Sequence, residues 1–424
     1  MANTHVFETK MSDRMQVTRF SVPVWAGQAS FEERAKLKSG QSVTRPYTDF
    51  SREDMGFYTR GTDLTAIDVA ETNETLTVTT IPAAALPIDD FDEIQSNFAL
   101  QSEYAKRLMS AVNSMIDMDY LAEVENAASY VDGADVGGSA GGIALTTSNV
   151  LNVYSAALRK LQAQNVAIAG IGDPRIDTTS IKKGNMKPGG SSGFANIDPH
   201  FNEILNLAVS GRATERGDMV GKHGYVNTYF EFDNFVSTNT WWEGVIGLAT
   251  NPTANDTVVI NGVTFTFVAT LGSAGDLHIA SSADATRANM ENALNAPGTS
   301  IAEATDTGYT AVSAANQKLL KWTTATDDAT ANTLTVSMKG RDYVLVSETF
   351  TDGSDAWDSE ISHLMFGQKG AVDMVIQKSI NLKVSDIPLQ FGKYLKPNAL
   401  YGKKTFAEGA KALVDVRIDT SGRT

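Results

Sequence analysis

The stretch that decides the fold runs from residue 91 to residue 128 and reads FDEIQSNFALQSEYAKRLMSAVNSMIDMDYLAEVENAA. Its apolar side chains keep near-helical spacing, and Asp90 with Glu93 three residues later resembles a capping box at the start. The apolar positions are Ile94, Phe98, Ala105, Leu108, Val112, Met115, Ile116 and Val124. A helix over 91–128 would be about 55 Å long, far beyond the average helix of a globular domain. A helix of this length therefore predicts an unusual architecture rather than an ordinary globular domain.

The residues before this helix predict an arm and a loop. Residues 1–60 hold few regular apolar runs and many turn residues, so we expect an arm over 1–30 and an extended loop over 31–70. The β-branched, alternating stretch Thr75–Ile81 then predicts a strand.

The residues after the helix predict a mixed α/β lobe. Gly133–Gly142 is typical of a flexible glycine-rich loop, and a second helix is predicted over 148–164. A further helix is expected over 201–209 and a strand over 225–236. Trp241 and Trp242 come next, and they favour core anchoring or a subunit contact over ligand stacking.

The segment 243–360 differs in composition and reads as a small inserted α+β domain. It carries 15 acidic residues against 5 basic ones, a balance of −10 within a net charge of −15. Asn261-Gly262 between two β-rich runs predicts a hairpin with a type I′ turn. A short helix is expected over 282–294, and strands over 333–338 and 343–346. The acidic balance argues against tight nucleic-acid binding by this segment.

The end of the chain continues the fold that precedes the insert. Alternating apolar residues from Val372 to Val384 predict a long strand, and 414–418 predicts a closing strand. Because both flanks read as one fold, the middle domain is interpreted as inserted rather than appended. This end is slightly basic, with 10 basic residues against 5 acidic ones over 361–424.

Composition excludes several classes of function. The 424 residues include no cysteine, which removes disulfides, thiolate metal sites and cysteine nucleophiles. No apolar run approaches the roughly 18 residues of a membrane span, and the start has no signal-peptide pattern. We therefore expect a soluble protein made in a cytoplasm, with no membrane partner.

The order of elements resembles the Hong Kong 97-type major capsid protein of tailed phages. The closest local match is Ile81–Phe91 leading into the long helix. His363–Val372 and Leu400–Lys404 resemble the closing pattern, a long strand and later a short turn. The resemblance covers about 30–242 and 361–420.

The resemblance implies an α+β, Hong Kong 97-like capsid fold. Its parts are listed by residue number: N-terminal arm 1–30, extended loop 31–70, peripheral domain 71–147 with a spine helix at about 91–128, axial α/β domain 148–242, inserted surface domain 243–360, and closing axial and peripheral strands 361–424.

The same resemblance implies a non-enzymatic function. Copies would form the hexamers and pentamers of an icosahedral shell around double-stranded DNA, which the wall touches only weakly. A separate scaffolding protein and a portal are the expected partners, and the virion capsid is the expected location. The extended loop would cross a neighbouring subunit, and residues 41–63 contain no lysine for the isopeptide cross-link that some family members make.

Five charged loop residues are the candidates for inter-subunit ion pairs, with plain solvation as the alternative: Arg45, Arg52, Glu53, Asp54 and Arg60. No catalytic residue, cofactor or metal ligand is predicted. The five histidines show no pair at helical spacing, and Gly137–Gly142 lacks the Gly-Lys-Ser/Thr of a phosphate loop. The acidic run Asp352–Glu360 favours a solvated loop over calcium binding.

A second function remains open at this point. The chain could be a phage decoration or tail adhesin protein whose 243–360 domain binds host surface glycans. A shell subunit should form particles of megadalton mass, whereas an adhesin should form small oligomers.

Overall fold

The computed structural model describes residues 23–31, 42–48, 55–60, 71–90, 100–164, 166, 193–209, 225–229, 232–353, 355–388, 391–421 and 423. The chain divides into two compact units. Unit 1 comprises Met1–Ser21, Phe31–Ile116 and Asp373–Lys404, and unit 2 comprises Val22–Ser30, Asp117–Val372 and Thr405–Thr424.

The helices and short 3-10 turns, in chain order, are η1 (Trp25–Gly27), α2 (Leu100–Leu121), η4 (Ala122–Asn126), η5 (Gly133–Val136), α3 (Val150–Ala163), α5 (Pro199–Val209), α6 (Ala283–Asn295), α7 (Ala314–Leu319) and α8 (Ala407–Lys411). The strands are β1 (Ser42–Thr48), β2 (Glu71–Thr77), β3 (Leu86–Asp89), β4 (Ser129–Val131), β5 (Gly193–Ile197), β6 (Tyr225–Tyr229), β7 (Phe232–Val236), β8 (Trp241–Gly247), β9 (Thr257–Ile260), β10 (Val263–Val268), β11 (Asp276–His278), β12 (Thr323–Asp328), β13 (Thr333–Lys339), β14 (Val346–Glu348), β15 (Ala356–Gln368), β16 (Asp373–Asp386), β17 (Gly392–Lys404) and β18 (Leu413–Asp419).

The long helix is present as α2, whose 22 described residues extend for about 33 Å. Residues 91–99 of the predicted span lie outside the described residues. The predicted end near residue 128 is wrong, because the α-helix stops at Leu121 and tightens into η4. Ala127 already has an extended backbone, and the backbone N–H of Ala128 donates to the carbonyl of Ala410. The chain then continues into β4 at Ser129.

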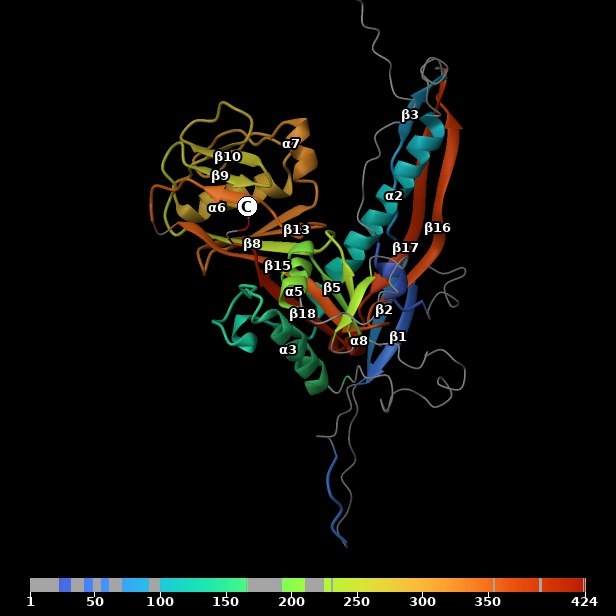
Figure 1. Ribbon diagram of the computed structural model, residues 1–424. Helices are drawn as coiled ribbons and strands as arrows, with labels where there is room; N and C mark the ends of the chain where they lie inside the picture. Colours follow the sequence, from blue (N-terminus) through green and yellow to red (C-terminus); the bar gives the residue numbers. More distant parts are fainter. Residues whose placement is uncertain are drawn as a thin grey trace, which may run out of the picture. The chain divides into compact units, whose positions relative to one another are not determined.

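Unit 1 holds two small antiparallel sheets. β1 pairs with β2 over seven residues, and β16, β17 and β3 form a three-stranded sheet in that order. Figure 1 shows β16 and β17 as a long hairpin. The predicted long strand is confirmed as β16, but two register shifts between Ile376 and Asn381 break its alternation, and no described residue from Ile376 to Asp386 is fully buried.

Unit 2 is built on a nine-stranded sheet. Seven strands follow the order β12-β13-β8-β15-β5-β7-β6, while β18 pairs with β15 and β4 pairs with β18. Figure 1 labels β13, β8, β15, β5 and β18 of this sheet. β5 is buried along its whole length. Beside it lies an aromatic cluster from α3, α5, β7 and β15, with ring centroids 5.4 to 6.2 Å apart: Tyr154, Phe201, Phe232 and Phe366.

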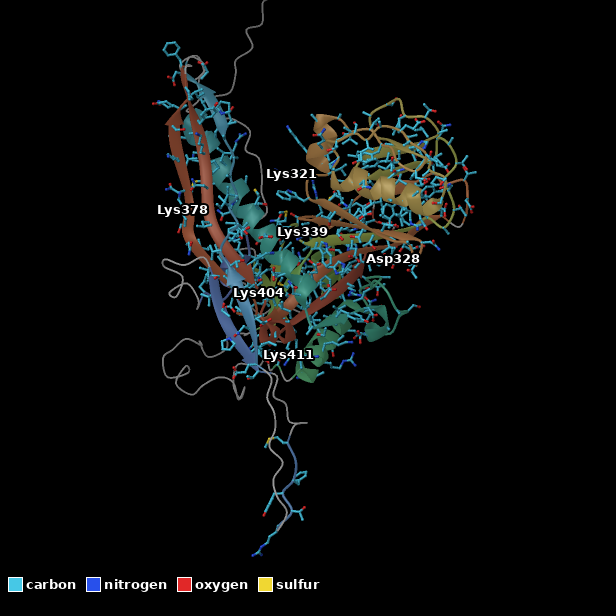
Figure 2. The ribbon with its side chains drawn as sticks, turned by 180° about the vertical axis from the view of Figure 1, so that it is seen from behind. Lys321, Asp328, Lys339, Lys378, Lys404 and Lys411 are labelled. Atoms are coloured by element: carbon cyan, nitrogen blue, oxygen red, sulfur yellow. The ribbon has the colours of Figure 1, made fainter. Side chains whose placement is uncertain are left out.

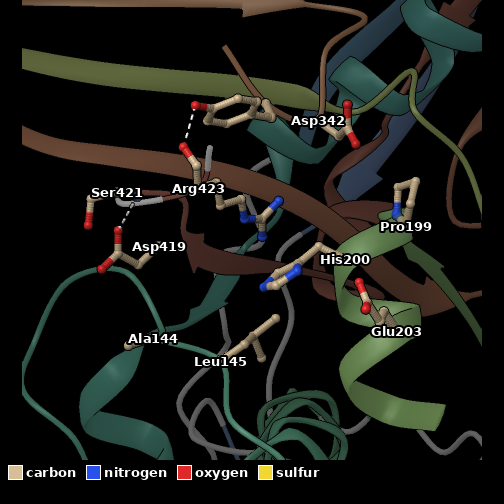
Figure 3. A pocket seen from close by; sticks show the side chains of 10 residues that line it. Ala144, Leu145, Pro199, His200, Glu203, Asp342, Asp419, Ser421 and Arg423 are labelled. Carbon is tan, nitrogen blue, oxygen red and sulfur yellow. Dashed lines mark hydrogen bonds between the residues drawn. The ribbon is translucent and has the colours of Figure 1, made fainter. Parts of the chain in front are cut away.

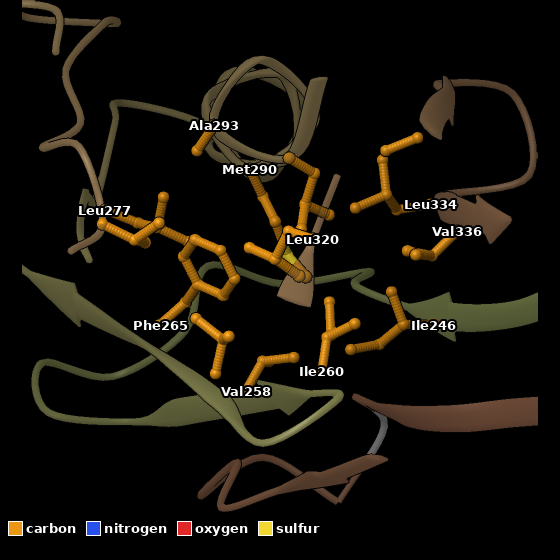
Figure 4. Close-up of a cluster of buried hydrophobic side chains, with 14 of the residues drawn as sticks. Ile246, Val258, Ile260, Phe265, Leu277, Met290, Ala293, Leu320, Leu334 and Val336 are labelled. Atoms are coloured by element: carbon orange, nitrogen blue, oxygen red, sulfur yellow. The ribbon is translucent and has the colours of Figure 1, made fainter. Parts of the chain in front are cut away.

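The segment 243–360 has a hydrophobic core of its own that also uses Trp242. Its strands β11-β10-β9-β14 form a four-stranded sheet, and α6 contributes Met290 and Leu294 to the cluster (Figure 4). However, β12 and β13 belong to the nine-stranded sheet, and β8 and β15 run across the predicted boundaries at 243 and 360. The domain limits stay a prediction, since this sheet is shared.

Two local predictions inside this segment are confirmed, the hairpin turn at Asn261-Gly262 and the helix over 282–294. Asn261 and Gly262 have φ values of 50° and 78°, as the tight turn between β9 and β10 requires. Ser282 caps α6 by accepting the backbone N–H of Ala285.

Several other predictions were wrong in detail. Tyr225–Val236 is not one strand but the antiparallel pair β6 and β7. The strand predicted over 343–346 begins only at Val346, as β14. Leu400–Lys404 is not a turn but the end of β17. Gly133–Gly142 begins with the ordered turn η5, whose capping box joins Asp132 and Asp135.

Candidate assembly surface

The first candidate surface is the exposed segment 55–60 between β1 and β2. Its side chains of Met55, Phe57 and Tyr58 are 62%, 106% and 61% exposed. Three large apolar side chains in one short exposed segment mark a contact surface more often than a solvated loop. The exposed side chains of this segment are apolar, whereas the sequence analysis predicted contacts through charged residues.

Among the described residues, the ribbon that flanks this segment packs closely against β17 at one end. β1 and β2 form a two-stranded ribbon, which is marginal when it stands alone. Leu76 is fully buried, and the carbonyl oxygen of Thr77 lies 2.1 Å from where a Cβ on Gly402 of β17 would be. Packing therefore holds the end of the ribbon near Thr77, while Thr48 and Glu71 at the other end are exposed.

The five charged candidates are not brought together by the described residues. The Nη1 of Arg45 in β1 is 3.3 Å from the Oδ2 of Asp373 in the same chain. Arg60 is exposed at the end of the 55–60 segment, and Arg52, Glu53 and Asp54 lie outside the described residues. Their contact with a neighbouring subunit stays a prediction. The signal that sequence reasoning missed is the apolar run Met55-Gly56-Phe57-Tyr58 directly after the charged stretch.

A buried carboxylate fixes the segment that precedes this loop. Asp117, at 0% exposure, accepts the backbone N–H groups of Val24 at 2.7 Å and Trp25 at 3.2 Å. Its other oxygen accepts from Asn239 at 3.0 Å and Ser237 at 3.3 Å. Burial raises the pKa of the Asp117 carboxyl, and these four hydrogen bonds oppose the rise. These hydrogen bonds tie the segment around Val24 and Trp25 to the end of α2.

A cavity of about 630 Å³ lies beside the start of α5 (Figure 3). Arg423 pairs with Asp198 at 3.0 Å, and Asp198 also caps α5 by accepting the N–H of Phe201. Burial and the nearby Asp198 raise the pKa of Asp342 on the wall. These contacts hold the last described residues of the chain against α5, which is a structural task.

A catalytic reading of this cavity finds no support in its geometry. The hydrogen bonds between its lining residues run from the Tyr343 hydroxyl to the carbonyl of Arg423 and from the Ser421 N–H to Asp419. No hydrogen bond joins Ser421 to His200 among the described residues, so no nucleophile and base are paired there.

A buried Asp–His pair lies on the nine-stranded sheet. The Nδ1 of His363 is 2.9 Å from Asp415, which also accepts from Arg417, and the His363 ring stacks on Trp241. The Nε2 of His363 has no hydrogen-bond partner among the described residues. A Ser–His–Asp arrangement would place a hydroxyl there. The described part of the chain also holds no group of three His, Asp or Glu side chains placed to bind a metal ion.

None of the described helices is long and apolar enough to span a bilayer.

Comparison with known proteins gives a likeness of structure without one of sequence. No family model matches the chain, and no curated protein matches it. The chain is similar to a structure from Mycobacterium phage Che8, with a TM-score of 0.51 and 10% identity over 98% of both chains. It is also similar to the capsid of Ralstonia phage GP4, with a TM-score of 0.49 and 8% identity over 98% of this chain and 96% of that one.

The likeness to the Che8 structure extends over the whole chain and is not limited to residues 243–360, so it does not favour the adhesin alternative. At this level of identity it establishes the fold. With its long helix, two-stranded ribbon and mixed α/β lobe, the chain has the Hong Kong 97-like fold of tailed-phage capsid proteins.

Proposed function

We propose that this chain is the major capsid protein of a tailed bacteriophage. Many copies, arranged as hexamers and pentamers, would close into the icosahedral head shell around double-stranded DNA. The observation that carries the proposal is the fold likeness over 98% of both chains. The subunit would have no enzymatic activity.

The exposed 55–60 segment supplies the physical reason for assembly. A neighbouring copy that covered Met55, Phe57 and Tyr58 would gain about 1.5–3 kcal/mol for each fully buried side chain. The entropy cost of association offsets part of this gain, so each contact is weak alone. Closed symmetry repeats the contact many times, which makes a stable shell from weak interfaces.

The five charged candidates would lie around this apolar contact. Arg52, Glu53, Asp54 and Arg60 flank the 55–60 segment in sequence, and Arg45 lies on the adjoining strand. Exposed ion pairs contribute about 0–1 kcal/mol each, so their role would be orientation more than affinity.

The remaining partners follow from the proposed shell. A separate scaffolding protein would guide assembly and a portal would admit the DNA, which the wall would touch only weakly. The subunit would be made in the host bacterial cytoplasm and would end in the virion. The acidic segment 243–360 would then form an outward-facing surface domain, because its charge of −10 repels DNA.

Expression of the full chain, alone and with its scaffold, tests the proposal. We expect closed particles of megadalton mass by negative-stain microscopy and sedimentation. The double variant Phe57→Ser and Tyr58→Ser should abolish particles while leaving the melting temperature unchanged, because both side chains are already exposed in the subunit. Small oligomers as the only product under all conditions would refute the proposal.

Excision of the proposed surface domain is a second test. Gly247 at the end of β8 pairs with Ala356 at the start of β15, so residues 248–355 can be replaced by a short turn without cutting either strand. We expect this shortened chain to assemble. Loss of folding would show that the segment is part of the main core.

A further inference from the structure

Four of the five basic residues of the 243–360 segment lie at one end of a strand ladder. The segment has only five basic residues, and Arg287 is buried between Asp284 and Asp327. The other four are Lys318, Lys321, Lys339 and Arg341.

Strand register places these four residues at one end of the ladder. Thr323 at the start of β12 pairs with Met338, so Lys321 just before β12 and Lys339 at the end of β13 lie together. Figure 2 shows Lys321 and Lys339 close to each other, with Asp328 at the far end of the same strands. Lys318 ends α7, three residues before Lys321, and Arg341 follows β13. We call these four residues the basic end.

The opposite end of the ladder is acidic. Asp328 pairs with Thr333, which pairs with Gly247, which pairs with Ala356, so the ends of β12 and β8 meet the starts of β13 and β15. The exposed carboxylates there include Asp328, Asp352 and Asp358, besides Asp284, which pairs with Arg287. Asp352 belongs to this end because it accepts from Thr250, three residues after β8. We call Asp328, Asp352 and Asp358 the acidic end.

The basic end also carries exposed apolar side chains. Leu319, Trp322 and Leu345 are 41%, 40% and 53% exposed. Leu319 and Leu345 lie at one turn, because Asn261 donates its backbone N–H to the carbonyl of Leu345 and its side-chain amide to the carbonyl of Leu319. The Nζ of Lys321 lies 5.0 Å from the centroid of the Trp322 ring. Apolar side chains rimmed by like charges are typical of a protein contact.

We infer that the basic end binds the acidic end of the same segment in a second copy of the chain, head to tail. Lysine ammonium groups around Trp322 would meet the carboxylates of Asp352 and Asp358. The two ends of one copy are about 17 Å apart along β12, which exceeds the Debye length of about 8 Å at physiological salt. They therefore do not neutralise each other within one subunit, whereas contact between copies brings opposite charges together.

Strand pairing is a poor alternative for this contact. β12 is an edge strand, but the side chain of Asn295 occupies both backbone groups of Ala325 at 2.8 and 2.9 Å. A strand added along β12 would have to displace this amide. Charge and apolar contact at the two ends remain the means of association, and a head-to-tail contact of this kind generates rings or rows.

Charge exchange on the full-length chain tests the inference. The basic-end variant is Lys318→Glu with Lys321→Glu, and the acidic-end variant is Asp352→Lys with Asp358→Lys. Association is measured by sedimentation velocity at concentrations too low for shells. We expect each variant alone to raise the dissociation constant about tenfold or more, because like charges then meet at the contact.

An equimolar mixture of the two variants should recover wild-type association, since each offers the other an opposite charge. The chain with all four substitutions should recover it as well. Glu291→Lys on α6 is the control for a change of charge away from both ends, and equal melting temperatures exclude misfolding. The inference would be overturned if the basic-end variant or the acidic-end variant, measured alone, associated like the wild type. It would also be overturned if neither the mixture nor the fourfold variant recovered association.

The outcome is separate from that of the proposed function. If charge exchange restored association but microscopy showed no shells, this contact would be supported and the proposed function rejected. Shells that form equally well from every variant would support the proposed function and reject this contact.

Discussion

Replacement of the buried Asp117 should release the N-terminal segment from unit 2. Asp117→Ala leaves four donors without their acceptor: the N–H groups of Val24 and Trp25, the Asn239 amide and the Ser237 hydroxyl. At about 1 kcal/mol for each donor, the low end of the range because water can enter, the loss is about 4 kcal/mol. With about 2.1 cal/mol/K of unfolding entropy per residue over 424 residues, this corresponds to a fall in melting temperature of roughly 5 °C.

Asp117→Asn separates the role of shape from that of charge. One amide oxygen can still accept from Val24 and Trp25, while the new NH2 group faces Asn239 and Ser237, which can reorient to accept. We expect a loss of about 1–2 kcal/mol. Asp119→Asn, in the same helix but partly exposed, is the control and should cost less.

The pH dependence has a definite sign. Burial raises the pKa of Asp117 above its ordinary value of 3.8, so the folded chain holds the proton more tightly than the unfolded chain. Its contribution to the free energy of unfolding is fully present below the unfolded pKa and is lost as the pH rises through the folded pKa. The stability of the wild type relative to Asp117→Asn should therefore be greater at about pH 4.5 than at about pH 8.

Urea unfolding measures these free energies, and chymotrypsin cleavage after Trp25 measures release of the segment. We expect faster cleavage in Asp117→Ala than in the wild type. If Asp117→Ala were as stable as the wild type, or if the stability difference from Asp117→Asn grew with pH, the four hydrogen bonds or the direction of the pKa shift would be wrong.

Three further substitutions test other parts of the fold. Gly402→Ala should destabilise unit 1 by more than about 2 kcal/mol in urea unfolding, because its Cβ would lie 2.1 Å from the carbonyl oxygen of Thr77. An unchanged midpoint would show that the strands separate easily. Arg287→Ala should cost about 3–5 kcal/mol, because it removes a fully buried guanidinium and leaves Asp327 unpaired. A loss below about 1 kcal/mol would contradict this. Phe57→Ser should leave the free energy of unfolding within about 0.5 kcal/mol of the wild type, since the ring is exposed. A larger loss would mean that the ring packs within the subunit.

Local chemistry made some elements predictable. The turn at Asn261-Gly262 needs two residues that tolerate positive φ, and the α6 cap needs a hydroxyl such as that of Ser282. Residues close in sequence therefore determine both features. The long helix was likewise predictable from the spacing of its apolar residues. Its end was not, because the contact of Ala128 with Ala410 involves residues 282 positions apart, and no local pattern encodes it.

Strand β17 was missed for a physical reason. It contains Pro397, which normally argues against a central strand. In the structure Pro397 pairs with Leu382 of β16, while β3 pairs with Gly392–Leu395 on the other side of β17. The candidate surface was missed in a similar way: the sequence shows that Phe57 is apolar, but only the fold shows that it is exposed.

The continuity of β15 has a consequence for anything attached to the chain. Residues 356–363 pair with β8 and residues 361–367 pair with β18, so one unbroken strand joins the 243–360 segment to the rest of unit 2. Strand β15 therefore joins the two parts without a flexible linker. A peptide grafted into a turn such as Asn261-Gly262 would therefore be displayed in a fixed orientation, as on a rigid bracket, which suits regular arrays of antigens or enzymes.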